Sequence, residues 1–229
     1  MSMRRSTSDN RLVVLLNPSS PVAEAYRTLR TNIQYSSVDA PIQLLMAASA
    51  QSGEGKSTVI SNLAVAYALE GKRVLLIDTD LRKPTIHRIF AQTNRLGLTN
   101  LLTSQSSLQE VIRDGGIDNL DIITSGPTPP NPAELLGSHR MKVILEELRE
   151  RYDLILFDTP PVLPVTDSLI MSSYCDGVLL VIHAGKVKKA YVRKAKEKLD
   201  FVQSRIIGAV FNQMKRQDIA FVKYYGTSK

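Results

Sequence analysis

Nine consecutive residues have the spacing of a polyphosphate-binding loop. The run Ala50-Gln51-Ser52-Gly53-Glu54-Gly55-Lys56-Ser57-Thr58 departs from the pattern G-x-x-x-x-G-K-[ST] only at Ala50, which replaces the first glycine. Gly53 and Gly55 let the backbone come close to a polyphosphate, while exposed N–H groups and the positive end of a helix supply an anion site. Lys56 would reach the β- and γ-phosphates, and the Ser57 hydroxyl would hold Mg²⁺. We expect a nucleoside triphosphate to bind through Ser52, Gly53, Glu54, Gly55, Lys56, Ser57 and Thr58, although the loop does not say which reaction follows.

Three aspartates stand where predicted strands end. Asp78 and Asp80 follow the apolar segment 74–77, and Asp158 follows the segment 154–157. In a parallel sheet the carboxyl ends lie on one edge, where ligands bind, so these side chains should sit beside the phosphate loop. An extended chain would aim Asp78 and Asp80 at the same side. Asp158 is the natural acid for Mg²⁺, and a further acid can orient a nucleophile and take its proton. The alternative is that these aspartates only cap helices or turns.

Short apolar segments alternate with helical ones along most of the chain. They predict buried strands at 44–48, 74–77, 120–123, 154–157, 178–182 and 206–211. A helix should run from Ser57 to Gly71 and another should start at Asn131 and Pro132, whereas residues 84–118 are mixed, with short helices near 98–102 and 108–113. Apolar strands that alternate with helices imply a parallel sheet covered on both faces. The predicted fold class is therefore α/β, a doubly wound, mostly parallel sheet flanked by helices, of the P-loop NTPase type.

The two ends of the chain differ from this central part. Residues 1–20 are polar apart from Leu12–Leu16, and we expect a flexible N-terminal arm with a short apolar anchor. Ser20 is a suitable N-cap for a helix that begins at Pro21. The apolar face of that helix would hold Val22, Tyr26, Leu29 and Ile33. Residues 21–212 would then form a single P-loop domain, and residues 213–229 a flexible tail with tyrosines.

The composition excludes several classes of protein. The chain has 229 residues, of which 43% are apolar and 22% charged, as in globular domains. With one cysteine, neither a disulfide framework nor a cysteine-based zinc site is expected. No apolar run approaches the roughly 20 residues that span a bilayer, and the N-terminus lacks the apolar core of a signal peptide. The net charge of +7 favours anionic partners without choosing among phosphates, acidic proteins and membrane surfaces.

Three motifs besides the phosphate loop together resemble the bacterial protein-tyrosine kinases, which are cytoplasmic P-loop kinases associated with exopolysaccharide and capsule assembly. They are Asp78-Thr79-Asp80-Leu81-Arg82-Lys83-Pro84, the proline-rich run at 125–136, and Asp158-Thr159-Pro160-Pro161. The resemblance covers nearly the whole chain. The length matches the form in which the kinase is a separate polypeptide from its transmembrane activator.

The resemblance implies that ATP, with Mg²⁺, phosphorylates tyrosine hydroxyls of this and other proteins. The catalytic residues would be Lys56, Asp78 and Asp80, with Asp78 favoured as the base and Asp80 as its partner at the metal. Ser57, Asp80 and Asp158 would hold the metal, and Asn212, after the last strand, would contact adenine. Phosphoryl transfer has a loose transition state, so positioning matters more than a strong base.

Two further features fit this family. Glu24, Arg27 and Arg30 have the spacing Glu-x-x-Arg-x-x-Arg on the first helix, and in the family such a helix packs subunits into a ring. From spacing alone, an ordinary surface pair describes them equally well. Tyr224 and Tyr225 lie in the tail, where the family carries a richer cluster of phosphoacceptor tyrosines that enter a neighbour's active site. The alternative for these tyrosines is packing on the surface.

The resemblance also implies partners and a location. We expect a homo-oligomeric ring, a transmembrane activator of the polysaccharide co-polymerase type, protein substrates with tyrosine, and a tyrosine phosphatase; nucleic acid is not expected. The protein would be cytoplasmic and recruited peripherally to the inner face of the cell membrane through the activator. There it would regulate exopolysaccharide or capsule biosynthesis and export.

The main alternative is a partition or division-site ATPase switch that binds DNA or membrane. Such proteins typically carry a lysine where this chain has Gln51, and a C-terminal amphipathic helix that residues 212–229 do not predict. A small-molecule kinase would need an acceptor pocket that the sequence does not identify. A scaffold that binds ATP without turnover would not need Lys56 and the three aspartates.

A run of basic residues at 186–198 falls on one predicted helix. Its simplest interpretation is a solvated face. It could also meet the anionic cytoplasmic leaflet or an acidic segment of the activator.

Overall fold

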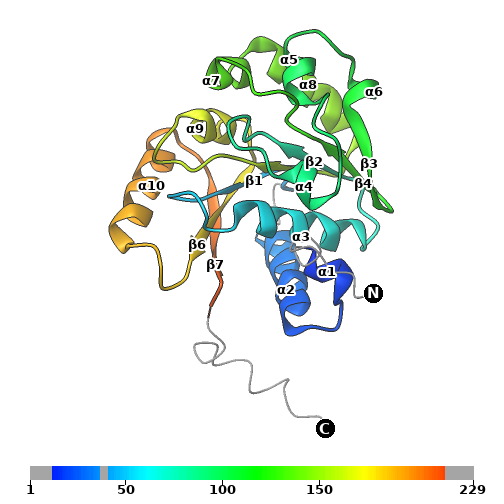
Figure 1. Cartoon of the computed structure of the whole chain (residues 1–229). Coiled ribbons are helices and arrows are strands. Elements are labelled where there is room, and N and C mark those ends of the chain that lie inside the picture. The colour runs from blue at the N-terminus through cyan, green and yellow to red at the C-terminus, as the bar shows by residue number, and fades with distance from the viewer. Residues whose placement is uncertain (1–11, 37–40, 215–229) are drawn as a thin grey trace, which may run out of the picture.

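Each apolar segment predicted as a buried strand is a strand in the computed structural model, which describes residues 12–36 and 41–214. The prediction of burial is wrong for the segment 206–211, whose residues are partly or fully exposed. The strands are β1 (Leu44–Ala48), β2 (Val74–Asp78), β3 (Ile112–Ile117), β4 (Leu120–Ile123), β5 (Leu154–Asp158), β6 (Gly177–His183) and β7 (Ile206–Asn212). The helices of the described part are α1 (Val13–Leu16), α2 (Pro21–Tyr35), α3 (Lys56–Ala68), α4 (Ile86–Ile89), α5 (Leu98–Leu102), α6 (Leu108–Val111), α7 (Pro132–Leu136), α8 (His139–Arg151), α9 (Asp167–Ser172) and α10 (Lys189–Phe201). Figure 1 shows helices on both faces of one sheet. The predicted doubly wound α/β fold is confirmed.

The order of the strands decides which strand ends become neighbours. The sheet runs β3-β4-β2-β5-β1-β6-β7, so β5 lies between β1 and β2. All described pairs are parallel except β3 with β4. In this register Asp158 stands beside Ala47 of β1 and beside Asp78 of β2. The strand that carries Asp158 is therefore inserted between the strand that leads to the phosphate loop and the strand that carries Asp78.

Strand β3 departs from the prediction for residues 84–118. The short helix near 108–113 ends at Val111, and the chain continues at once into an edge strand antiparallel to β4. The segment Arg113-Asp114-Gly115-Gly116 is polar and rich in glycine, so it lacks the apolar run by which the buried strands were predicted. An antiparallel partner held by a tight turn is enough to make it a strand.

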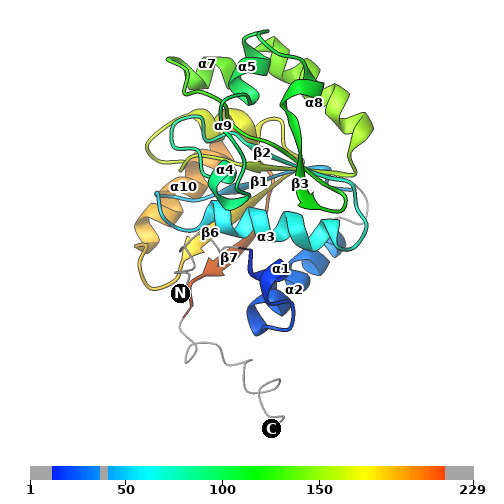
Figure 2. The same cartoon turned by 45° about the vertical axis from the view of Figure 1, so that its right-hand side comes forward.

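Alternate residues of the central strands face two separate cores. Leu44 and Met46 of β1 pack with α5 to α10, whereas Leu45 and Ala47 pack with α1 to α4. Figure 2 shows the same division, with α3 along one face of the sheet and α7 and α8 beyond the other. Because both faces are covered, these strands are apolar throughout and do not alternate with polar residues.

Helix α2 begins where predicted and turns a slightly different face inward. The Ser20 side chain accepts a hydrogen bond from the backbone N–H of Ala23, so Ser20 is the N-cap. Ala23, Tyr26 and Ile33 are buried, and the helix packs on α1 and α3. The prediction that Val22 joins this apolar face is wrong, since its side chain is exposed.

The prediction of a flexible arm over residues 1–20 is wrong for residues 12–20. Val13–Leu16 form helix α1, the Val14 side chain is buried, and the Val14 N–H donates to Oδ1 of Asn62 in α3 (3.1 Å). The apolar anchor is thus a docked element, because α2 and α3 leave a site that one valine fills. Residues 1–11 lie outside the described part of the chain.

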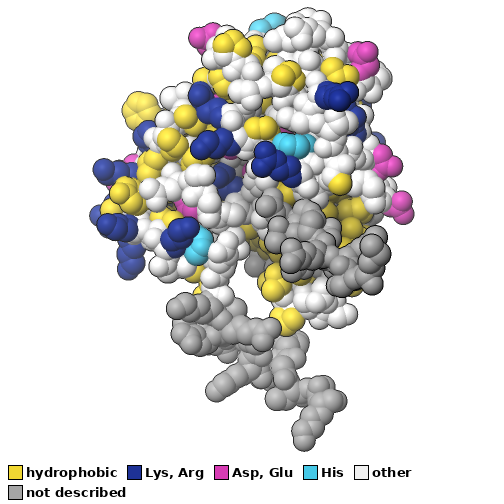
Figure 3. All heavy atoms as spheres, in the orientation of Figure 1, with side chains coloured by type: hydrophobic (Ala, Val, Ile, Leu, Met, Phe, Trp, Pro, Cys, Tyr) yellow, Lys and Arg dark blue, Asp and Glu magenta, His cyan; other side chains and the backbone are white. Residues whose placement is uncertain are grey.

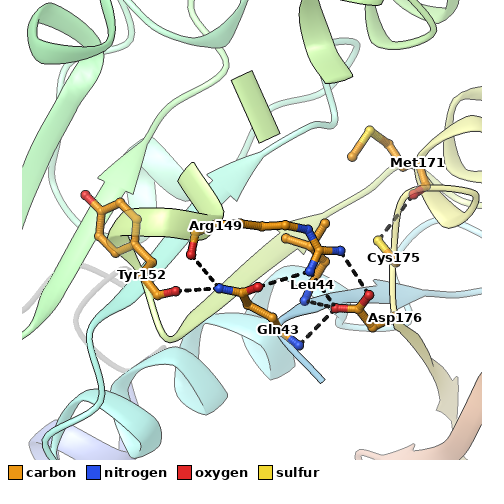
Figure 4. A network of polar contacts seen from close by, with 7 residues as sticks. All are labelled: Gln43, Leu44, Arg149, Tyr152, Met171, Cys175 and Asp176. Carbon is orange, nitrogen blue, oxygen red and sulfur yellow. Dashed lines mark hydrogen bonds and ion pairs between the residues drawn. The ribbon is translucent and has the colours of Figure 1, made fainter. Parts of the chain in front are cut away.

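A polar network around Asp176 closes the amino edge of the sheet (Figure 4). The Asp176 carboxylate accepts hydrogen bonds from the N–H groups of Gln43 (3.0 Å) and Leu44 (2.7 Å) and pairs with the Arg149 guanidinium (2.9 Å). The Gln43 side-chain amide donates to the carbonyl oxygens of Arg149 (2.7 Å) and Tyr152 (2.9 Å). The network therefore satisfies the first N–H groups of β1 and the last carbonyls of α8 together.

No helix among residues 12–36 and 41–214 combines the length and the apolar character that a bilayer crossing requires.

The docking of α1 can be tested by comparing two apolar side chains of the same short helix. Val14→Ala should lower the free energy of unfolding by about 1–3 kcal/mol, because it leaves a cavity against α3. Leu16→Ala removes an exposed side chain and should change it by less than about 0.5 kcal/mol. Urea unfolding of the full chain measures both. Equal effects of the two changes would show that α1 does not dock as described.

Candidate active site

The phosphate loop is bent sharply at two glycines, and its lysine is folded toward the sheet. Gly53 and Gly55 have φ values of +80° and +94°, which non-glycine residues rarely adopt, and α3 begins directly after them at Lys56. The Lys56 ammonium donates to the hydroxyl of Ser49 (3.0 Å) at the end of β1. The side chains of Gln51 and Ser52 are exposed. The glycines thus allow the sharp bend, and Ser49 fixes the position of the lysine.

Glu54 ties the phosphate loop to itself and to the neighbouring strand β6 through its side chain. The carboxylate is buried and accepts hydrogen bonds from the N–H groups of Gln51 (2.6 Å) and His183 (3.2 Å), the last residue of β6. This contact joins the loop to the end of a strand far along the chain. Sequence reasoning assigned Glu54 to nucleotide binding as a loop member and did not foresee the contact with His183, for which the sequence holds no signal.

Asn212 also lies against the loop. Its Nδ2 atom donates to the carbonyl of Glu54 (2.9 Å), and a Cβ atom at Gly55 would stand only 2.0 Å from that nitrogen. Gly55 therefore serves two purposes, since it supplies the left-handed turn and makes room for Asn212. The residue predicted to contact adenine is thus at the rim of the phosphate loop.

Asp158 is a buried carboxylate without a hydrogen-bond partner. Only 1% of the residue is exposed, and neither carboxylate oxygen has a partner in the described part of the chain. Burial raises the pKa of Asp158 to about 6, although the charge of Lys56 opposes the rise. A carboxylate that is orphaned in this way beside a phosphate loop is suited to receive a cation.

Asp78 and Asp80 differ strongly in their surroundings. Asp78 is fully buried, and its carboxylate accepts hydrogen bonds from the N–H groups of Thr85 (2.9 Å) and Ile86 (3.0 Å) at the start of α4. Burial, together with the charge of Asp158, holds the pKa of Asp78 well above its ordinary value. Asp80 is partly exposed and accepts from the N–H of Lys83 (2.9 Å). The two aspartates are near each other, but only Asp80 reaches the surface.

Two buried threonines hold the three strand ends together. The Thr79 hydroxyl donates to the carbonyl of Asp158 (2.6 Å), and the Thr159 hydroxyl donates to the carbonyl of Ala47 (2.8 Å). Each threonine follows an aspartate, so the Asp-Thr pairs could have signalled this role. They fix β2 to β5 and β5 to β1 at the point where the chemistry would take place.

An ion pair between an exposed arginine and a buried aspartate holds the loop that carries Asp80. Arg82 pairs with the carboxylate of Asp167 through Nε (2.9 Å) and Nη2 (3.0 Å), and Asp167 is fully buried at the start of α9. This bidentate geometry restricts the segment between β2 and α4 more than a single contact would. Sequence reasoning quoted Arg82 only as part of a motif and missed its partner.

The remaining predicted residues are not part of this cluster. Glu24 pairs with Arg27 on the exposed side of α2 (2.6 Å). Arg30 is turned toward α3, where it donates to the carbonyl of Ala66 (3.0 Å) and pairs with Glu70 (3.3 Å). Tyr224 and Tyr225 lie outside the described residues.

Comparison with known proteins extends over most of the chain. A family model described as an AAA domain matches residues 43–207. The tyrosine-protein kinase YwqD of Bacillus subtilis (strain 168) is 46% identical over 224 residues, which are 98% of this chain and 94% of that protein. The putative tyrosine-protein kinase CapB of Staphylococcus aureus is 39% identical over 99% of each chain.

Solved structures agree with these relatives. The crystal structure of the chimerical protein CapA2B2 has a TM-score of 0.88 and 39% identity, and covers 90% of this chain and 91% of that one. The cell division ATPase MinD of Pyrococcus furiosus has a TM-score of 0.66 at 23% identity, and covers 77% of this chain and 74% of that one. The second likeness shows the fold alone.

The buried carboxylate of Asp158 makes a prediction about stability and pH. Its pKa of about 6 in the folded chain exceeds the value of about 4 in an unfolded chain, so ionisation above pH 6 destabilises the folded state. Asp158→Asn should therefore raise the free energy of unfolding of the nucleotide-free protein by about 1–3 kcal/mol at pH 8. The gain should fall to roughly half at pH 5, where the wild-type carboxyl is mostly protonated.

Urea unfolding at both pH values measures this gain. Glu146→Gln, which alters an exposed acid of α8, is the matched control and should change stability by less than about 0.5 kcal/mol. A loss of stability in Asp158→Asn at pH 8 would contradict the prediction and would mean that Lys56 stabilises the carboxylate more than burial destabilises it.

Proposed function

The chain belongs to the bacterial protein-tyrosine kinase family, and on that premise we propose that it transfers the γ-phosphoryl group of ATP to tyrosine hydroxyls. The observation that carries the proposal is the meeting of the phosphate loop with three carboxylates at one edge of the sheet. The insertion of β5 between β1 and β2 produces that meeting.

We propose that Lys56 and the loop backbone bind the phosphates. Lys56 lies at the start of α3, so its charge adds to the positive helix end and to the free N–H groups of the loop. On binding, the ammonium would exchange the Ser49 hydroxyl for a phosphate oxygen. Its charge would then offset the negative charge that develops on the leaving diphosphate.

Ser57, Asp80 and Asp158 would hold Mg²⁺. The orphaned carboxylate of Asp158 supports this assignment. In the sheet, β5 with Asp158 lies between β1, which leads to Ser57, and β2, which leads to Asp80. No group of three acidic, histidine or cysteine side chains forms a metal cage in the described residues. Mg²⁺ in nucleotide sites needs only one or two carboxylates, since phosphates and water complete its shell. The bound ion would neutralise phosphate charge and orient the γ-phosphoryl group.

Asp78 is proposed as the base. Its raised pKa supports this role, because a carboxylate with a higher proton affinity accepts a proton more readily from a tyrosine hydroxyl, whose ordinary pKa is near 10. The Thr85 and Ile86 N–H groups hold one oxygen of Asp78 in place. The other oxygen accepts a hydrogen bond from the N–H of Asp80 (3.2 Å). Because Asp78 is fully buried, an acceptor hydroxyl would have to displace the segment that carries Asp80 in order to reach this oxygen.

We propose that the acceptors include Tyr224 and Tyr225 of the tail, together with tyrosines of other proteins. The proposal extends to a transmembrane activator that recruits the chain to the inner face of the cell membrane, and to a tyrosine phosphatase that reverses the reaction. The process served would be exopolysaccharide or capsule synthesis and export, as the family resemblance implies.

The ring remains a separate proposal. Glu24 and Arg27 pair with each other on the exposed side of α2, where they could meet a second copy, although Arg27 also donates to the carbonyl of Pro18 (2.5 Å). Arg30 is turned toward α3 of its own chain. We therefore propose that Glu24 and Arg27 form the contact and that Arg30 fixes the position of α2 on α3.

The alternative of an ATPase switch has less support. Likeness to MinD is limited to the fold, and Gln51 stands where such switches typically carry a lysine.

The proposed reaction predicts which single change abolishes phosphotyrosine. With Mg²⁺ and ATP, Lys56→Met should reduce phosphotyrosine on the full chain by at least about 100-fold, because the transferred charge loses its main cationic partner. Lys72→Met, which alters an exposed lysine after α3, is the matched control and should retain labelling. Intact-mass measurement, with and without a candidate activator segment, gives the readout.

The same assay tests the tail. The double change Tyr224→Phe and Tyr225→Phe should remove most self-labelling and spare the labelling of an added substrate. Undiminished self-labelling would place the acceptors elsewhere. ATP hydrolysis without phosphotyrosine, even with the activator segment, would favour the ATPase switch.

The proposed ring contact predicts a change in size. Glu24→Ala with Arg27→Ala should shift the protein to monomer size by light scattering, at a concentration at which the parent assembles. Thr31→Ala with Asn32→Ala alters two exposed residues of the same helix and should leave assembly intact. If the Glu24 and Arg27 variant keeps the parent's size, α2 is not the contact.

A further inference from the structure

Nearly all of the chain's net positive charge lies on one segment. Residues 186–198 hold seven cationic side chains and one anionic one, a net charge of +6 out of +7 for the whole chain. The seven are Lys186, Lys188, Lys189, Arg193, Lys194, Lys196 and Lys198, and all are exposed. The other 216 residues are almost neutral. Figure 3 shows Lys and Arg side chains gathered where Figure 1 places α10.

The folded chain uses little of this charge. Among described residues, the one ion pair that these seven side chains make is Lys196 with Asp200 (2.5 Å). Lys188 and Lys189 stand at the start of α10, where cations oppose the helix dipole and where no acidic residue offsets them. Lys189 and Arg193, and likewise Lys194 and Lys198, are like charges one helical turn apart, which destabilise a helix. The stability of the fold therefore does not explain the pattern.

Aromatic side chains accompany the cations. Phe201, the last residue of α10, is 88% exposed, and Tyr191 is 37% exposed. The helix is anchored through Ala195 and Leu199, so the side that carries Phe201 and Lys194 faces away from the core. Cations mixed with aromatic side chains on an outward helix face are typical of proteins that lie on an anionic membrane surface.

We propose that α10 and the residues just before it, 186–201, form a surface that binds the anionic headgroups of a lipid bilayer. With Asp200 included, this surface carries a net charge of +5. The cations would contact headgroup phosphates, and Phe201 would enter the interfacial layer. The inner side of α10 packs on the core that it shares with α5 to α9, whereas α2 packs on the opposite core. The proposed ring contact on α2 would therefore leave the outer side of α10 free. The proposal uses none of the nucleotide-binding residues and does not depend on the kinase reaction.

Sedimentation of the full chain with vesicles tests the proposal. Vesicles of phosphatidylcholine with about 30% phosphatidylglycerol should bind the protein, and pure phosphatidylcholine should not, since the attraction needs anionic lipid. In one variant, Lys186, Lys189, Arg193 and Lys194 are all changed to Gln. Its affinity for the anionic vesicles should be at least about tenfold lower than that of the parent. Phe201→Ser should also weaken binding. Raising the salt concentration should weaken binding by the parent.

A matched variant distinguishes an effect of this surface on vesicle binding from an effect of the protein's net charge. Changing Lys72, Arg88, Arg95 and Lys142 to Gln removes the same charge from exposed sites elsewhere and should leave vesicle binding within about twofold. The α10 variant should keep or raise the parent's melting temperature, because it removes like-charge repulsion. Equal loss in the two four-residue variants would overturn the proposal. So would stronger binding to duplex DNA or to polyglutamate than to the anionic vesicles, because either would assign the surface to another class of partner.

Discussion

Repulsion between buried carboxylates on adjacent strands is the constraint around which this site is built. Asp78 and Asp158 are in register on β2 and β5, both are buried, and Asp158 has no hydrogen-bond partner. A chain selected only for stability would not keep such a pair. The surrounding contacts offset the repulsion without removing it, because Thr79 ties the two strands and α4 donates N–H groups to Asp78. A cation at this edge would relieve the repulsion.

The phosphate loop is held by the carboxyl ends of the last two strands, β6 and β7. Glu54 contacts the end of β6 through its side chain and the end of β7 through its carbonyl. The position of the loop therefore depends on strands that lie 129 and 158 residues further along the chain.

The apolar strands and the residues at their ends could be predicted, because buried parallel strands are apolar runs and their carboxyl ends share an edge. The nearness of Lys56 to Asp158 follows from that rule. Strand β3 could not be predicted in this way, since Arg113-Asp114-Gly115-Gly116 has no apolar pattern and depends on its partner β4. The docking of Val14, the inward turn of Glu54 and the pairing of Arg82 with Asp167 depend on contacts between residues far apart in sequence. Periodicity and capping rules describe near neighbours only, so they hold no information on such contacts.

The network around Asp176 gives the two edges of the sheet different characters. At the amino edge the strand starts and the end of α8 have their hydrogen bonds satisfied, while the carboxyl edge keeps an orphaned carboxylate. The orphaned carboxylate is a local frustration at the carboxyl edge, which the Asp176 network at the amino edge does not share. Opening fluctuations should therefore be more frequent at the carboxyl edge. Backbone amides at the base of the domain should then exchange more slowly than those at its rim.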